Sequence, residues 1–145
     1  AARLNLGSLY ASMGKFPDAI VQLKKAILLN PKQPAGRLTL AAVYADTKQW
    51  ERSRDLYLSV AQSHPKLYQS FLGLGSIHER QGQYLDAVRA YQKVIMMGGR
   101  SARVYTAVAR AYLALGQKKE AKHALETALE IDPNYPSALK ILRAQ

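Results

Sequence analysis

The chain has 145 residues, with 21 lysine and arginine residues against 10 aspartate and glutamate residues, a formal net charge of +11. It contains no cysteine, which excludes disulfides, a thiolate metal site and a cysteine nucleophile, and no apolar run approaches the roughly 18 residues of a membrane-spanning helix. With 48% hydrophobic and 21% charged residues, the composition is that of a folded domain. The positive charge favours acidic partners but carries no information about the fold.

Apolar residues recur with a helical period along the chain, beginning with Leu6, Leu9, Tyr10 and Met13. Glycines stand where helices must end in a residue that tolerates positive φ; they are Gly14, Gly82 and Gly116. Pro34 and Pro136 stand where helices begin, because proline needs no N–H partner in the first turn. We predict helices at residues 1–13, 17–29, 34–46, 50–63, 67–80, 84–97, 101–114, 118–130 and 136–145.

Several residue types recur every 34 residues. The helix breakers in one such register are Pro31, Pro65, Gly99 and Pro133. Another register holds Tyr10, Tyr44, His78 and Tyr112, and a small residue recurs as Ala19, Ser53, Ala87 and Ala121. The large apolar partners are Leu23, Tyr57, Tyr91 and Leu125. A fixed period of this length indicates a repeat protein, whose units cannot bury their apolar faces alone and therefore stack.

The pattern resembles the tetratricopeptide repeat (TPR), whose units carry L-G-x-x-Y, a later pair of small and large residues, and a proline near the end. Residues 6–10, LGSLY, followed by Ala19, Leu23 and Pro31, match it closely. The resemblance covers essentially the whole chain. It implies an all-α fold, a right-handed superhelical solenoid of antiparallel helix pairs, in which small residues such as Gly7 let paired helices approach closely.

The same resemblance predicts one TPR domain over residues 1–145. Its repeats are expected at approximately 1–33, 34–67, 68–101 and 102–135, and a terminal helix at 136–145 would act as a solvating cap. Because Ala1 falls inside the first predicted helix, we expect the chain to be a fragment of a longer protein. The sequence does not indicate a cellular compartment.

Residues that could carry catalysis or bind a metal are not grouped. His64, His78 and His123 lack the spacing of metal ligands, and His78 is interpreted as a substitute for tyrosine in its register. Residues 73–76, GLGS, resemble the start of a phosphate-binding loop, but no third glycine and no preceding strand accompany them. We therefore expect no enzymatic activity, no cofactor and no metal.

In the TPR family the first helix of each unit lines a concave groove, which mostly binds peptides or partner helices. The matching registers give the predicted partner-binding residues Leu4, Leu38, Ala42, Leu72, Ser76, Arg103, Thr106, Arg110 and Lys140. The leucines are expected to take apolar side chains, and the basic residues a carboxylate or acidic side chain. A second interpretation stays open, in which the leucines pack between neighbouring first helices and Arg110 pairs with Glu79.

Some TPR proteins clamp the acidic tail of heat-shock chaperones with lysine and asparagine on their first helices. Leu4 and Ser8 stand at those positions in the first unit, and the second and third units also lack the two residues, so binding of that type is not expected. Protein binding in the groove is the preferred hypothesis. The alternatives are self-association, and binding of nucleic acid, an acidic polysaccharide or an anionic membrane surface by basic second helices. The positive charge is spread evenly along the chain, which weakens the polyanion alternative.

Overall fold

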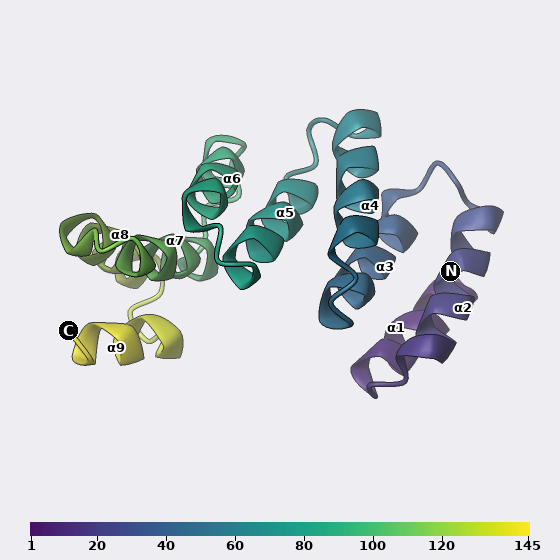
Figure 1. Ribbon diagram of the computed structural model, residues 1–145, viewed down its shortest axis with the longest axis horizontal. Helices are drawn as coiled ribbons and strands as arrows, with labels where there is room; N and C mark the ends of the chain where they lie inside the picture. The colour runs from purple at the N-terminus through teal and green to yellow at the C-terminus, as the bar shows by residue number, and fades with distance from the viewer. The chain divides into compact units, whose positions relative to one another are not determined.

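The computed structural model describes all 145 residues and is entirely helical outside its turns (Figure 1). Its helices are α1 (Ala2–Ser12), α2 (Phe16–Leu29), α3 (Pro34–Asp46), α4 (Trp50–Ser63), α5 (Gln69–Arg80), α6 (Tyr84–Met96), α7 (Ala102–Ala114), α8 (Lys118–Ile131) and α9 (Pro136–Arg143). These bounds agree with the nine predicted helices to within two residues at each end, so the all-α prediction is confirmed. Residues Ala1–Gly73 and Leu74–Gln145 form two compact units. The assignment of the whole chain to a single domain of four repeats stays a prediction.

In the N-terminal unit, α1 contacts α2, α2 contacts α3, and α3 contacts α4. The core between these helices contains Ala19, Leu23, Leu40, Val43 and Tyr44. Close packing of the first pair depends on Gly7, since a Cβ atom there would lie 2.7 Å from Cγ of Leu23. This contact confirms that a small residue at position 7 lets the paired helices approach.

The turns inside the helix pairs use a left-handed backbone conformation. Gly14, Gly82 and Gly116 have φ values of 73°, 76° and 76°, which confirms that these glycines end their helices with positive φ. Lys48 occupies the equivalent turn between α3 and α4 and has a φ of 60°. A residue with a Cβ atom is disfavoured in this conformation, so the turn at Lys48 carries backbone strain that the others avoid.

In the C-terminal unit, α7 packs against both α6 and α8, and α9 contacts α8 and α7 (Figure 1). Fully or almost fully buried side chains from three helices fill this unit, among them Tyr91, Val94, Val104, Val108 and Leu125. The α7 helix begins with a side-chain cap, because the backbone N–H of Val104 donates to Oγ of Ser101 at 3.2 Å. Arg103 and Arg110, two of the predicted site residues, are exposed on this otherwise largely buried helix.

Candidate functional site on α7

Four of the predicted partner-binding residues belong to the N-terminal unit. Leu4 is half-buried and packs against the core of α2 and α3. Leu38 and Leu72 are also half-buried, and Ala42 is exposed. Leu4 therefore contributes to packing, and all four present at least part of their side chains to solvent. Whether they bind a partner stays a prediction.

The remaining predicted residues belong to the C-terminal unit, and one of them needs correction. Thr106 is fully buried, with 0% of its surface exposed. Its hydroxyl donates to the backbone carbonyl of Ala102 at 2.7 Å, within α7 itself. Helix packing covers this position, so Thr106 offers no surface to a partner. Ser76 on α5 is half-buried, and Lys140 on α9 is exposed.

Arg110 on α7 is held by Glu79 on α5. Its Nε–H donates to Oε1 of Glu79 at 2.7 Å, and Nη2 donates to Oε2 at 3.3 Å. The Tyr91 hydroxyl donates to the same Oε2 at 2.8 Å. The Glu79 side chain is 17% exposed and that of Arg110 is 46% exposed. The pairing of Arg110 with Glu79, one of the two open interpretations, is therefore present, and it leaves about half of the Arg110 side chain in contact with solvent.

Arg103 lies on the same side of α7 as Arg110, because seven residues make about two helical turns. Arg103 is exposed. Its positive charge is near enough to the Tyr91 hydroxyl to lower the pKa of Tyr91, against the larger effect of burial, which raises it. We call Glu79, Tyr91, Arg103 and Arg110 the arginine cluster. Two guanidinium groups and one carboxylate give this cluster a residual positive charge.

The electrostatic interactions inside the cluster stabilise the charge states seen at neutral pH. The hydrogen bond from Arg110 to Glu79 raises the pKa of the guanidinium above its usual value, although burial opposes it. Burial raises the pKa of the Tyr91 phenol far above its usual value, and the hydrogen bond to Glu79 raises it further. Tyr91 therefore stays a neutral hydrogen-bond donor, and Arg110 stays charged.

Two residues of this region lie outside the predicted site. The repeat pattern predicts Tyr91 only as a large apolar core residue and does not predict the role of its hydroxyl. The sequence does contain a hint of this role. Leucine, which has no hydroxyl, fills the same position of the repeat at Leu23 and Leu125, so the core does not require a hydroxyl there. Tyr135, which precedes α9, is near enough to Arg110 to raise its pKa, so the start of α9 borders the cluster.

No group of three or more histidine, cysteine, aspartate or glutamate side chains is placed to hold a metal ion. None of the nine helices combines the length and the hydrophobicity that crossing a bilayer demands.

Family comparisons match both units. A family model described as "Tetratricopeptide repeat" matches residues 79–145, and one described as "TPR repeat" matches residues 7–48. The chain is a tetratricopeptide repeat protein. Proteins of this family are in general protein-interaction scaffolds, typically without catalytic activity, and the stacked helix pairs supply extended binding surfaces. The family therefore implies protein partners for this TPR chain.

Individual relatives are distant and much longer. The RNA polymerase-associated protein CTR9 of Caenorhabditis elegans is 26% identical over 136 residues, which cover 87% of this chain and 12% of that protein. The TPR repeat-containing protein YpiA of Bacillus subtilis (strain 168) is 29% identical over 143 residues, covering 94% of this chain and 32% of that protein. This TPR chain therefore corresponds to a minor part of either relative.

Solved structures show the same fold. The crystal structure of TTC0263, a thermophilic TPR protein from Thermus thermophilus, has a TM-score of 0.79 to this chain at 18% sequence identity. The match covers 91% of this chain and 74% of that one. At this identity the likeness concerns the helical architecture of the TPR chain alone.

Proposed function

We propose that this TPR chain binds a peptide or helix of a partner protein along its first helices, and that an acidic side chain of the partner binds at Arg103 and Arg110. The observation that carries the proposal is the arginine cluster. It places two guanidinium groups on one side of α7 and supplies only one carboxylate, Glu79, to balance them.

Arg110 remains able to bind although Glu79 holds it. A guanidinium group has five N–H donors, and the bonds to Glu79 use one on Nε and one on Nη2. The remaining donors can bind a second carboxylate. Because Glu79 already fixes the side chain, a ligand would lose less conformational entropy by ordering it. Arg103 adds a second, exposed charge on the same side of the helix.

Apolar contacts of the partner are proposed to fall on Leu38 and Leu72 in the N-terminal unit. Both side chains are half-buried, so each has a fixed direction and still presents apolar surface. The N-terminal unit is therefore proposed to contribute apolar contacts, and the C-terminal unit basic ones.

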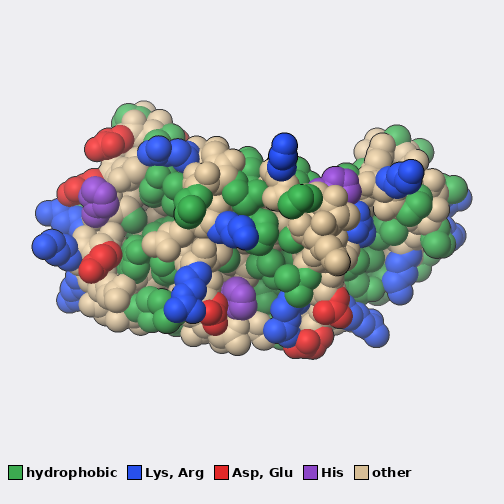
Figure 2. Space-filling model, turned by 90° about the horizontal axis from the view of Figure 1, so that it is seen from above, with side chains coloured by type: hydrophobic (Ala, Val, Ile, Leu, Met, Phe, Trp, Pro, Cys, Tyr) green, Lys and Arg blue, Asp and Glu red, His purple; other side chains and the backbone are tan.

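Polyanion binding by basic second helices is the weaker alternative. On the face shown in Figure 2, lysine and arginine side chains lie singly or in small groups, with apolar and neutral atoms between them. Several basic side chains of the second helices are also paired with neighbouring carboxylates, as in Arg54–Glu51, Arg89–Asp86 and Lys122–Glu126. A phosphate backbone binds best to an unbroken basic surface.

The test is a pull-down from cell extract at about 50 and 200 mM salt, with the partner proteins identified. The baits are the wild-type chain, Arg103→Glu, a Leu38→Arg and Leu72→Arg double variant, and the control Arg89→Glu. The control makes the same charge change on α6, where Arg89 is 70% exposed. Every bait is first shown to be helical by circular dichroism.

We expect the same proteins on the wild type and the control at both salt concentrations. Their recovery should fall with Arg103→Glu and with the double variant. If all baits instead retain nucleic acid that is released at the higher salt concentration, the groove proposal is wrong and the basic second helices are the binding surface.

A further inference from the structure

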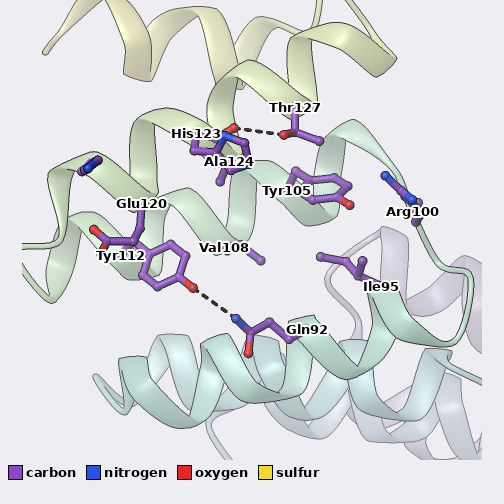
Figure 3. A pocket seen from close by; sticks show the side chains of 11 residues that line it. Gln92, Ile95, Arg100, Tyr105, Val108, Tyr112, Glu120, His123, Ala124 and Thr127 are labelled. Atoms are coloured by element: carbon purple, nitrogen blue, oxygen red, sulfur yellow. Dashed lines mark hydrogen bonds between the residues drawn. The ribbon is translucent and has the colours of Figure 1, made fainter.

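A pocket of about 570 Å³ lies on the other side of α7 from the arginine cluster, between α6 and α8 (Figure 3). Tyr105, Val108 and Tyr112 line it from α7, at i, i+3 and i+7 on one side of the helix. They are offset by two residues, about 200° around the helix axis, from Arg103 and Arg110. We call this feature the tyrosine pocket, and its volume falls in the range of about 300–1,000 Å³ that is usual for ligand sites.

The middle of the tyrosine pocket is apolar and aromatic. Tyr105 and Val108 lie at its centre, and Ile95 on α6 faces them (Figure 3). Tyr105 is half-buried, so its ring is held by packing and still presents a face to the pocket. Val108 is almost fully buried, so an apolar side chain inserted here would mainly remove the exposed parts of Tyr105 and Ile95 from water, which is the main favourable term in such contacts.

Charged and polar groups flank this middle part at both ends. At one end the Arg100 guanidinium lies over the Tyr105 ring, 5.9 Å from its centroid, in a cation–π arrangement. At the other end Tyr112 and Glu120 lie together (Figure 3), and Lys119 also lines the pocket. The Tyr112 hydroxyl accepts a hydrogen bond from Nε2 of Gln92 at 3.1 Å, so its own O–H remains a donor.

The lining charges identify the kind of ligand. Two basic residues, Arg100 and Lys119, line the pocket against one acidic residue, Glu120. This balance attracts a carboxylate at the Arg100 end. A nucleic acid backbone fits poorly, because it has no apolar side chain to place over the middle of the pocket and its phosphates would have to be desolvated there.

We propose that the tyrosine pocket binds an acidic peptide segment of a protein partner, which places an apolar side chain over Tyr105 and Val108 and a carboxylate against Arg100. This is a second binding surface of the chain, separate from the arginine cluster. The two surfaces lie on opposite sides of α7. The acidic segment in the tyrosine pocket therefore does not compete with a partner bound at the arginine cluster.

The test uses nuclear magnetic resonance titrations of the isotope-labelled full chain with three synthetic peptides. The probe is acetyl-EEFLEE-amide, and its controls are EESSEE, without the apolar residues, and KKFLKK, with reversed charge. The protein variants are Arg100→Glu, the control Arg143→Glu and the arginine-cluster variant Arg103→Glu. All three replace an exposed arginine with the same charge change. Arg100 lies just before α7, Arg103 lies on α7, and Arg143 ends α9.

We expect EEFLEE to shift the amide signals of Tyr105, Val108 and His123 with a single dissociation constant. Arg100→Glu should weaken this binding by about tenfold or more, as expected for reversal of a paired charge, whereas Arg143→Glu should leave it within about twofold. EESSEE and KKFLKK should bind at least about tenfold more weakly. A loss caused by Arg103→Glu alone would assign the peptide to the arginine cluster and overturn the pocket proposal without touching the proposed function.

Three further outcomes would also overturn the pocket proposal. The first is the absence of pocket shifts at millimolar EEFLEE. The second is that heparin shifts the pocket signals and EEFLEE does not, which would assign the pocket to polyanions. The third is that the pocket signals move on dilution of the protein without peptide, which would make a second copy of the chain the occupant.

Discussion

Leu6 and Leu40 occupy the same position of the 34-residue period, yet Leu6 is 36% exposed and Leu40 is 3% exposed. Leu40 is covered because α2 packs against α3, whereas the equivalent face of α1 is exposed in this structure. Leu9 and Val43 show the same contrast, with exposures of 54% and 2%. Equivalent residues in identical registers therefore allow the effect of stacking on stability to be measured directly.

We predict that Leu40→Ala lowers the free energy of unfolding by about 2–5 kcal/mol, because it leaves a cavity in the core. Leu6→Ala should cost only about 1 kcal/mol, because much of its side chain is already in water. Urea unfolding followed by circular dichroism measures both values. If both variants instead lost the same free energy of unfolding, and this loss grew with protein concentration, another copy of the chain would cover the exposed face of α1 in solution.

Gly75 on α5 is predicted to be required for packing against Tyr91. A Cβ atom at Gly75 would lie 2.6 Å from Cε1 of the Tyr91 ring, and this ring is 2% exposed and held in the core. Glycine to alanine in a helix ordinarily stabilises by about 1 kcal/mol. We expect the steric conflict to reverse that sign, so that Gly75→Ala lowers the free energy of unfolding by about 1–3 kcal/mol.

Thermal and urea unfolding of Gly75→Ala measure this change. Ser76→Ala is the control, because it alters the neighbouring residue of α5 and should change stability by less than about 0.5 kcal/mol. A Gly75→Ala variant more stable than the wild type would show that the Tyr91 ring moves aside at little cost.

The sequence predicted the helices more completely than the site. Helix ends are set locally, by residues such as Gly14, Gly116 and Pro34, and these act in the same way in any TPR chain. The shared face of Arg103 and Arg110 follows from helical spacing alone. The hydrogen bond from Tyr91 to Glu79 does not, because it depends on how side chains from two helices meet.

Burial of individual polar residues was equally hard to predict. Thr106 shares its register with Leu72, which is half-buried, yet Thr106 is fully buried. A threonine can satisfy its hydroxyl within its own helix, as the bond to Ala102 shows, and it then tolerates a dry environment. The tyrosine pocket was missed for a related reason, since it depends on the space left between α6 and α8.

Lys48 provides a prediction about the backbone. Its φ of 60° places it in the left-handed region that glycine occupies in the equivalent turns. Lys48→Gly should raise the free energy of unfolding by about 1 kcal/mol, because it removes the steric penalty of the Cβ atom. The reverse change, Gly82→Lys, should lower it by a similar amount. Urea unfolding of both variants is the measurement, and a destabilised Lys48→Gly protein would show that contacts of the lysine side chain outweigh the backbone term.

Tyr91 is predicted to make the fold less stable at alkaline pH. Burial, followed by the hydrogen bond to Glu79, raises the pKa of Tyr91 in the folded chain above its unfolded value of about 10. The fold therefore favours the neutral phenol, and this contribution to stability is complete below about pH 10. Above that pH the unfolded chain releases the proton first, so the free energy of unfolding falls by up to about 1.4 kcal/mol per pH unit.

Tyr91→Phe isolates this effect, because it has no phenolic proton to lose. Near neutral pH it should be less stable than the wild type by about 1 kcal/mol, through loss of the hydrogen bond to Glu79. Between about pH 10 and 11 the difference should shrink or change sign, because only the wild type loses the Tyr91 contribution. Urea unfolding at several pH values measures both curves, with Tyr10→Phe as the control for removal of a tyrosine elsewhere. Parallel curves for wild type and Tyr91→Phe across this range would mean that Tyr91 ionises as readily in the folded chain as in the unfolded one.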